Sequence, residues 1–161
     1  MRAIPYIFYL LLIAFHEVFL RNLTSIQGVT LNLPAIIVLT VALYRSELTA
    51  VWFGFIVGVV MSAGNPDLMG WNALVFSVLA VVAFHARERL NLDSFAAKLI
   101  LLIGGVLIHN LVTILVNQEP EILYQIWRLA LPSTVYTGLV ATVFLSLLEG
   151  RGTGTRARLL F

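Results

Sequence analysis

Residues 29–63, VTLNLPAIIVLTVALYRSELTAVWFGFIVGVVMSA, decide the fold class of this chain. Two apolar runs, residues 29–44 and 48–63, flank a short polar group at residues 45–47. The apolar residues are contiguous and do not alternate with polar ones, which argues against the strands of a membrane barrel. A helix satisfies its backbone hydrogen bonds within its own segment, as lipid requires. The stretch therefore predicts two membrane-embedded helices.

The same apolar character extends over the whole chain of 161 residues. Hydrophobic residues make up 60% of it and charged residues only 11%, which is more apolar surface than a soluble domain of this size can bury. We expect an all-α integral membrane protein, in which residues 1–161 form a single domain built as a six-helix transmembrane bundle. The six predicted spans are residues 4–20, 29–44, 48–63, 71–85, 99–116 and 129–148.

The positions of the basic residues predict the orientation of these spans. With six spans and both termini cytoplasmic, the outer side holds only Arg21 and Arg128. This bias follows the positive-inside rule. A crossing needs about 17–25 residues, so the second and third runs are short, and a re-entrant pair is the alternative. That alternative would move only the loop carrying Arg45. The predicted cytoplasmic basic residues are Arg2, Arg45, Arg87, Arg89, Lys98, Arg151, Arg156 and Arg158.

Residues suited to catalysis or metal binding do not form a recognisable group. The chain has no cysteine, which excludes disulfides and cysteine-ligated metals. The segment HEVFL at residues 16–20 lacks the second histidine of a zinc-protease motif, because Leu20 stands there. We expect His16, His85 and His109 at different depths, which does not suit a shared metal site. No nucleophile–base pair or pair of buried acids is visible, so we predict a protein that is not an enzyme and has no cofactor.

A polar stripe is predicted in the fifth span. Its members are four residues apart and therefore share one helix face, which should point into the bundle. Two interpretations stay open at this point. The stripe can form hydrogen bonds between helices, or it can line a ligand pocket or contact a partner helix. The stripe consists of Gly105, His109, Thr113 and Asn117, with Asn110 beside it.

Small residues also recur at helical spacing in two other spans. Gly54, Gly58 and Ser62 form such a ridge in the third span. Thr134, Gly138 and Thr142 form a second ridge in the sixth span. Ridges of small residues let the backbones of two membrane helices approach closely. The two ridges therefore predict a protein whose main activity is helix packing or docking.

The order of these features resembles the MreD family of bacterial rod shape-determining proteins. Residues 28–90 match in detail and the rest of the chain matches in outline. The second span opens near a proline, the third carries a Gly-Phe-x-x-Gly core, and the last span is entered through a proline. The family often has an acid where this chain has Ser62. The matching residues are Pro34, Gly54, Phe55, Gly58, Met69, Gly70, Ala73, Leu74 and Pro132.

The resemblance implies a non-catalytic scaffold subunit of the cell-elongation machinery in the bacterial cytoplasmic (inner) membrane, supporting lateral peptidoglycan synthesis. Expected partners are an MreC-like bitopic protein, MreB filaments, the RodA–transpeptidase synthase and membrane lipid, but not nucleic acid. The candidates for helix packing or a partner interface are Pro34, Gly54, Gly58, Ser62, Gly70 and Gly138.

The family is also similar in layout to the membrane substrate-binding subunits of energy-coupling-factor vitamin transporters. The alternative function is therefore a membrane subunit that binds a small molecule for transport. That function needs a sizeable pocket with converging polar groups at the outer side of the bundle, whereas a scaffold does not.

Overall fold

A computed structural model describes residues 4–20, 23, 25, 29–90, 94–116 and 121–150. Within these ranges the chain is helical and forms no β-strand, so the predicted all-α class is confirmed. The helical stretches are α1 (Ile4–Phe15) continued by η1 (His16–Leu20), α3 (Leu33–Tyr44), α4 (Glu47–Met61), η2 (Pro66–Leu68) continued by α5 (Met69–Arg89), α6 (Phe95–Val116), and α7 (Ile122–Gln125) continued by η3 (Ile126–Ala130) and α8 (Leu131–Gly150).

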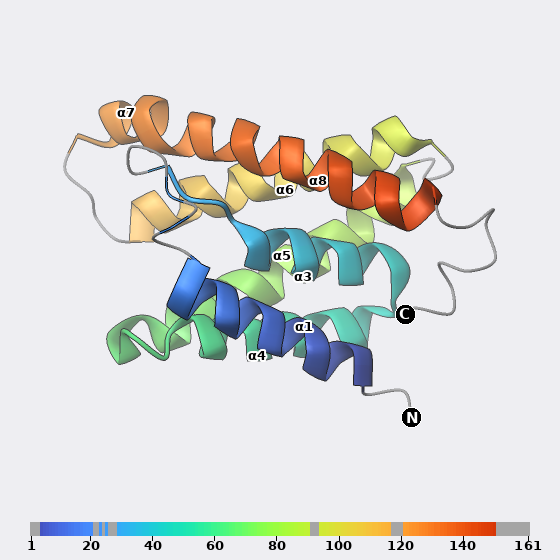
Figure 1. Cartoon of the computed structure of the whole chain (residues 1–161), viewed down its shortest axis with the longest axis horizontal. Coiled ribbons are helices and arrows are strands. Elements are labelled where there is room, and N and C mark those ends of the chain that lie inside the picture. Colours follow the sequence, from blue (N-terminus) through green and yellow to red (C-terminus); the bar gives the residue numbers. More distant parts are fainter. Residues whose placement is uncertain are drawn as a thin grey trace.

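The helices lie side by side along the long axis of the molecule and alternate in direction (Figure 1). In this view α6 and α8 form one layer, α3 and α5 the next, and α1 and α4 the third. α4 packs on α5, and α6 packs on α8. The first residues of α1 and the last residues of α8 lie at the same end of the bundle (Figure 1).

Helix α3 is the centre of the bundle. Every residue from Pro34 to Leu43 is buried, and the helix contacts α1, α4, α5, α6 and α8. Its 12 residues span about 18 Å at 1.5 Å per residue, which is less than the hydrocarbon core of about 30 Å. Irregular backbone at membrane depth is tolerated where protein encloses it. The partly buried residues 29–32 that lead into α3 meet this condition.

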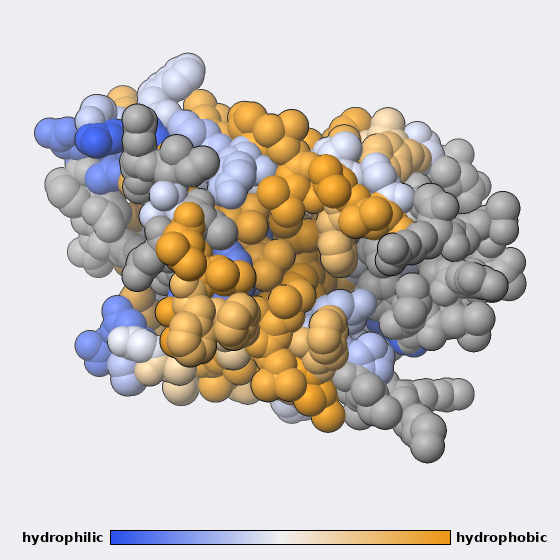
Figure 2. Space-filling view, in the orientation of Figure 1, coloured by the Kyte–Doolittle hydropathy of each residue, from blue (hydrophilic) through white to orange (hydrophobic). Residues whose placement is uncertain are grey.

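Three helical stretches are long and apolar enough to cross a membrane: Pro66–Arg89, Phe95–Val116 and Ile122–Leu147. α1 with η1, α3 and α4 are apolar but shorter. Figure 2 shows a broad apolar band over the middle of the molecule, with hydrophilic residues gathered toward the ends of the helices. This surface suits a lipid environment, because lipid contributes no hydrophilic partners along the middle of a helix.

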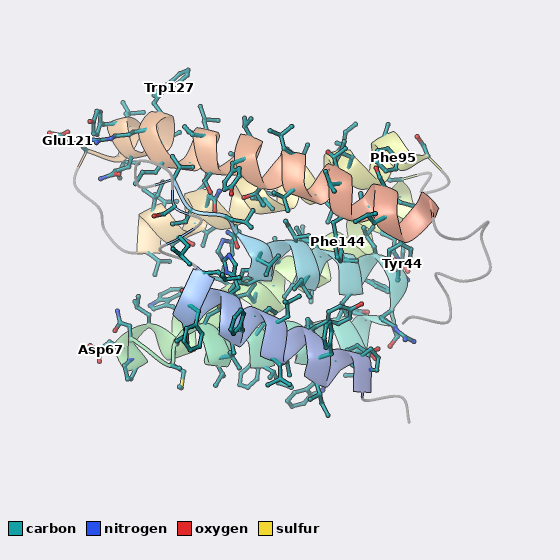
Figure 3. All side chains as sticks on the ribbon, viewed as in Figure 1. Tyr44, Asp67, Phe95, Glu121, Trp127 and Phe144 are labelled. Carbon is teal, nitrogen blue, oxygen red and sulfur yellow. The ribbon has the colours of Figure 1, made fainter. Side chains whose placement is uncertain are left out.

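The two ends of the bundle differ in charge. At one end the Arg45 guanidinium lies over the Tyr6 ring at 5.6 Å, and the Lys98 ammonium lies over the Tyr44 ring at 5.9 Å. Arg87 reaches the end of α3 there. Asp67, Glu121 and Trp127 lie at the opposite end (Figure 3). The end with Arg45, Arg87 and Lys98 is called the basic end below, and the end with Asp67 and Glu121 the acidic end.

Candidate functional site

The small-residue ridge of the third span packs on the backbone of α5. A Cβ built on Gly54 would lie 2.6 Å from the carbonyl oxygen of Phe76, and one on Gly58 would overlap the backbone of Asn72 and Ala73. Only glycine permits this approach, because any other residue carries a Cβ at that point. Ser62 ends the ridge, where its hydroxyl accepts a hydrogen bond from the Asn72 amide at 2.8 Å.

The other small residues have different surroundings. A Cβ on Gly105 would lie 2.7 Å from both terminal methyl carbons of Leu39 in α3, so α6 approaches the central helix closely there. A Cβ on Gly138 would lie 3.2 Å from the Ile103 side chain, between α8 and α6. Gly70 has open space where a Cβ would be. Thr134 and Thr142 donate their hydroxyl protons to carbonyl oxygens in their own helix.

Asn32 connects three parts of the bundle. Its Oδ1 accepts from the backbone N–H of Ala35 at 3.2 Å and so caps the N-terminus of α3. Its Nδ2 lies 2.8 Å from Nδ1 of His109 and donates to Oδ1 of Asn110 at 3.0 Å. Its backbone N–H donates to the Thr137 hydroxyl at 3.1 Å. Asn32 therefore links α3 to α6 and α8, and it fixes where α3 begins.

These contacts also determine which ring nitrogen of His109 carries the proton. A backbone N–H can only donate, so the Ala35 contact assigns the acceptor Oδ1 and the donor Nδ2 of Asn32. Nδ2 then donates to Nδ1 of His109, and the neutral imidazole must carry its proton on Nε2. The ring also packs against Phe76, with 4.5 Å between centroids. The hydrogen bonds between Asn32 and α6 are of the interhelical type expected for the polar stripe.

Asn110 extends the network to α8. Its Nδ2 donates to the hydroxyls of Thr134 at 3.2 Å and Ser133 at 3.4 Å. The Ser133 hydroxyl in turn donates to the carbonyl oxygen of Thr30 at 2.8 Å. The backbone that precedes α3 is thus hydrogen-bonded by side chains of α8, which is how a buried irregular segment avoids unsatisfied polar groups.

A cavity of ≈ 490 Å³ adjoins this network at the acidic end. Its size lies within the range of about 300–1,000 Å³ typical of small-molecule sites. Amide, hydroxyl and imidazole groups converge on it from α5, α6, the start of α3 and the stretch from α7 to α8. The polar lining residues are Glu17, Thr30, Asn32, Asn65, Asn72, His109, Asn110, Thr113, Gln125 and Ser133.

The remaining predicted residues have different surroundings. Asn117 lies outside the described residues. Thr113 lines the cavity and donates to the carbonyl oxygen of His109, and Pro34 lines it from the first turn of α3. His85 is exposed and contacts the Val81 carbonyl of its own helix. Among the residues that the structure describes, no group of three His, Cys, Asp or Glu side chains could hold a metal ion.

Sequence reasoning missed Asn32 and Asn72. Asn32 has a local signal, because an asparagine followed by a proline in the first turn is typical of a helix start. Asn72 has no such signal, since its importance depends on α5 lying against α4. No family model matches this chain, and the searches of curated proteins and of solved structures also return no match.

Proposed function

We propose that this chain is a non-catalytic scaffold of the bacterial cell-elongation machinery, of the MreD type, which acts by binding alone. The placement of the family-like residues carries the proposal. Pro34 lies in the first turn of α3, and Gly54 and Gly58 pack α4 against the backbone of α5 at Phe76 and Ala73. All of the residues behind the resemblance except Pro132, which lies in α8, therefore belong to α3, α4 and α5, and this use suits a protein whose helices position a partner.

The proposed topology has six spans in the cytoplasmic membrane, with both termini in the cytoplasm. Charge supports it, because Arg45, Arg87 and Lys98 share the basic end, whereas Arg128 lies on Tyr124 at the other end, with Asp67 and Glu121 (Figure 3). Lys and Arg concentrate on the cytoplasmic side of short loops. The acidic end, with Trp127 and Tyr124 exposed, would then face outward, where aromatic side chains suit the headgroup region.

Reporter fusions test this topology. Fusions after Arg45 and Lys98 should read cytoplasmic, and fusions at Asn65 and Glu121 should read external. The reason is that loops rich in Lys and Arg stay on the cytoplasmic side of the membrane. Paired alkaline phosphatase and green fluorescent protein fusions at each site give the measurement. An Arg45 fusion that does not read cytoplasmic, with the other three sites as expected, would mean that α3 and α4 form a re-entrant pair.

The scaffold role is tested by partner recovery. The chain should co-purify with the MreC-like bitopic protein encoded in the same genome, because a bundle with apolar outer faces can hold a single span by packing. The measurement is the molar ratio of the two proteins after affinity purification in mild detergent. An unrelated single-span protein of the same genome serves as the control. Equal recovery of both single-span proteins would contradict the proposal.

The second candidate function is the membrane subunit of a small-molecule transporter. The ≈ 490 Å³ cavity with converging polar groups favours it, because a transporter subunit needs such a pocket and a scaffold does not. The same purification separates the two functions when an ATPase pair from the genome is co-expressed. Recovery of the ATPases without the MreC-like protein would replace the scaffold by the transporter subunit.

A further inference from the structure

The cavity at the acidic end has polar groups that the bundle does not use. His109 holds its Nε2–H as a donor, because Nδ1 accepts from Asn32. In the described part of the chain, Oδ1 of Asn72 and the side-chain amide of Gln125 engage no protein group. The Thr113 hydroxyl donates within its own helix and keeps its capacity to accept. The lining therefore offers both donors and acceptors to a guest molecule.

These groups are held in place before any guest arrives. His109 is fixed by Asn32 and by the Phe76 ring, and Asn72 is fixed by its bond to Ser62. Side chains that are ordered in advance lose little entropy on binding. The flat Phe76 ring also lines the cavity and gives it an apolar surface among the amides. The cavity therefore has a preorganised polar lining, which an incidental gap between packed helices would lack.

The charge of the lining limits what the cavity can accept. Glu17 is the only charged residue among the described lining residues, which include no lysine or arginine. An anion would therefore find no cationic partner among the described lining residues, and it would lose its hydration on entry. A neutral guest avoids this cost, and each of its hydroxyl or amide groups can replace water with a fixed partner.

We propose that this cavity binds an uncharged, sugar-like group that bears several hydroxyls and an amide or ether, presented either as a free molecule or as the headgroup of a neutral glycolipid. His109 and Gln125 donate to the oxygens of this group, and Asn72 and Thr113 accept from its hydroxyls. The inference goes beyond the scaffold role, because it needs no protein partner, and a failure here leaves the partner-recovery experiment unaffected.

Two soluble monosaccharides test the chemistry. N-acetylglucosamine is neutral and glucuronate is anionic. Isothermal titration of the full chain in phosphatidylcholine nanodiscs should show saturable binding of N-acetylglucosamine, with glucuronate at least about tenfold weaker, since an unpaired charge costs more than 1.4 kcal/mol, the equivalent of a tenfold change. A second arm replaces part of the phosphatidylcholine with digalactosyl diacylglycerol and measures its retention with the purified protein. Binding in one arm only identifies the source of the group.

Two substitutions locate the site, and one controls for packing. Thr113→Val and Gln125→Leu should each weaken the probe about fivefold, the effect of one lost hydrogen bond. Neither residue makes a hydrogen bond between helices. Thr142→Val is the matched control, because Thr142 also donates to its own helix but does not line the cavity. Three outcomes would overturn the proposal: no saturable binding in either arm, equal or tighter binding of glucuronate, or unchanged affinity in both lining variants.

Discussion

Gly58→Ala should destabilise the purified protein more than the same change at any of Gly54, Gly105 and Gly138. A Cβ at residue 58 would overlap the backbone of Asn72 and Ala73, whereas at residue 105 it meets only the flexible end of Leu39. Backbone atoms cannot rotate away, so α4 and α5 must separate along their whole contact. We expect a loss of about 3 kcal/mol, at the upper end for overpacked cores. Lipid returns no hydrophobic gain when two membrane helices part.

The measurement is the melting temperature of the monomer in detergent, followed by fluorescence-detected size-exclusion after heating. Gly104→Ala is the matched control in α6, because a Cβ there meets nothing within 4 Å. It should melt at or above the wild-type temperature, since alanine favours a helix over glycine by about 1 kcal/mol. Gly54→Ala should fall between the two. If Gly58→Ala and Gly104→Ala melt at the same temperature, α4 and α5 do not approach closely enough for a Cβ at residue 58 to overlap the α5 backbone.

The glycine ridge illustrates how far sequence reasoning extends. The spacing of Gly54 and Gly58 indicates that a backbone comes close to α4, because the small residues recur on one face. It does not say which backbone. The partner is α5 of the same chain, and that choice depends on the antiparallel hairpin that α4 and α5 form. The ridge at Gly54 and Gly58 is therefore used for packing within the bundle.

The sequence pattern did not predict where α3 begins. An apolar run from residue 29 suggests a helix that starts there, but the helix begins at Leu33. Asn32 caps it and the preceding residues bond to Thr137 and Ser133 of α8. Those partners are more than 100 residues away. A local sequence pattern can predict the cap, but it cannot predict a hydrogen bond to a distant helix.

The sequence predicted the shared face of the polar stripe but not the surroundings of its residues. The four-residue spacing of Gly105, His109 and Thr113 places them on one face of α6, and helical geometry alone requires this. Their surroundings differ: Gly105 meets Leu39, His109 meets Asn32, and Thr113 faces the cavity. The cavity itself is lined by residues of α5, α6 and the stretch from α7 to α8, together with the start of α3. No spacing within one segment predicts that these elements meet around one cavity.

Arg87→Met should cause the second large loss of stability. Nη1 of Arg87 donates to the carbonyl oxygens of Ala42 at 3.0 Å, Leu43 at 2.8 Å and Arg45 at 2.9 Å. The last carbonyls of a helix have no partner within it and carry its negative dipole end. Ala42 and Leu43 are buried, so water cannot easily replace the guanidinium. We expect a cost of about 3 kcal/mol, because hydrogen bonds to a charged group are lost and buried acceptors are left unsatisfied.

Arg89→Met is the control, because it removes the same charge from an exposed position two residues further along α5. It should change the melting temperature little, as surface charges usually do. Arg87→Lys should lie between them, since an ammonium keeps the charge but not the planar guanidinium, which also lies over the Phe84 ring at 4.4 Å. Thermal melts of the three variants under identical detergent conditions give the comparison. Equal melting temperatures for Arg87→Met and Arg89→Met would show that the capping of α3 by Arg87 does not contribute to stability.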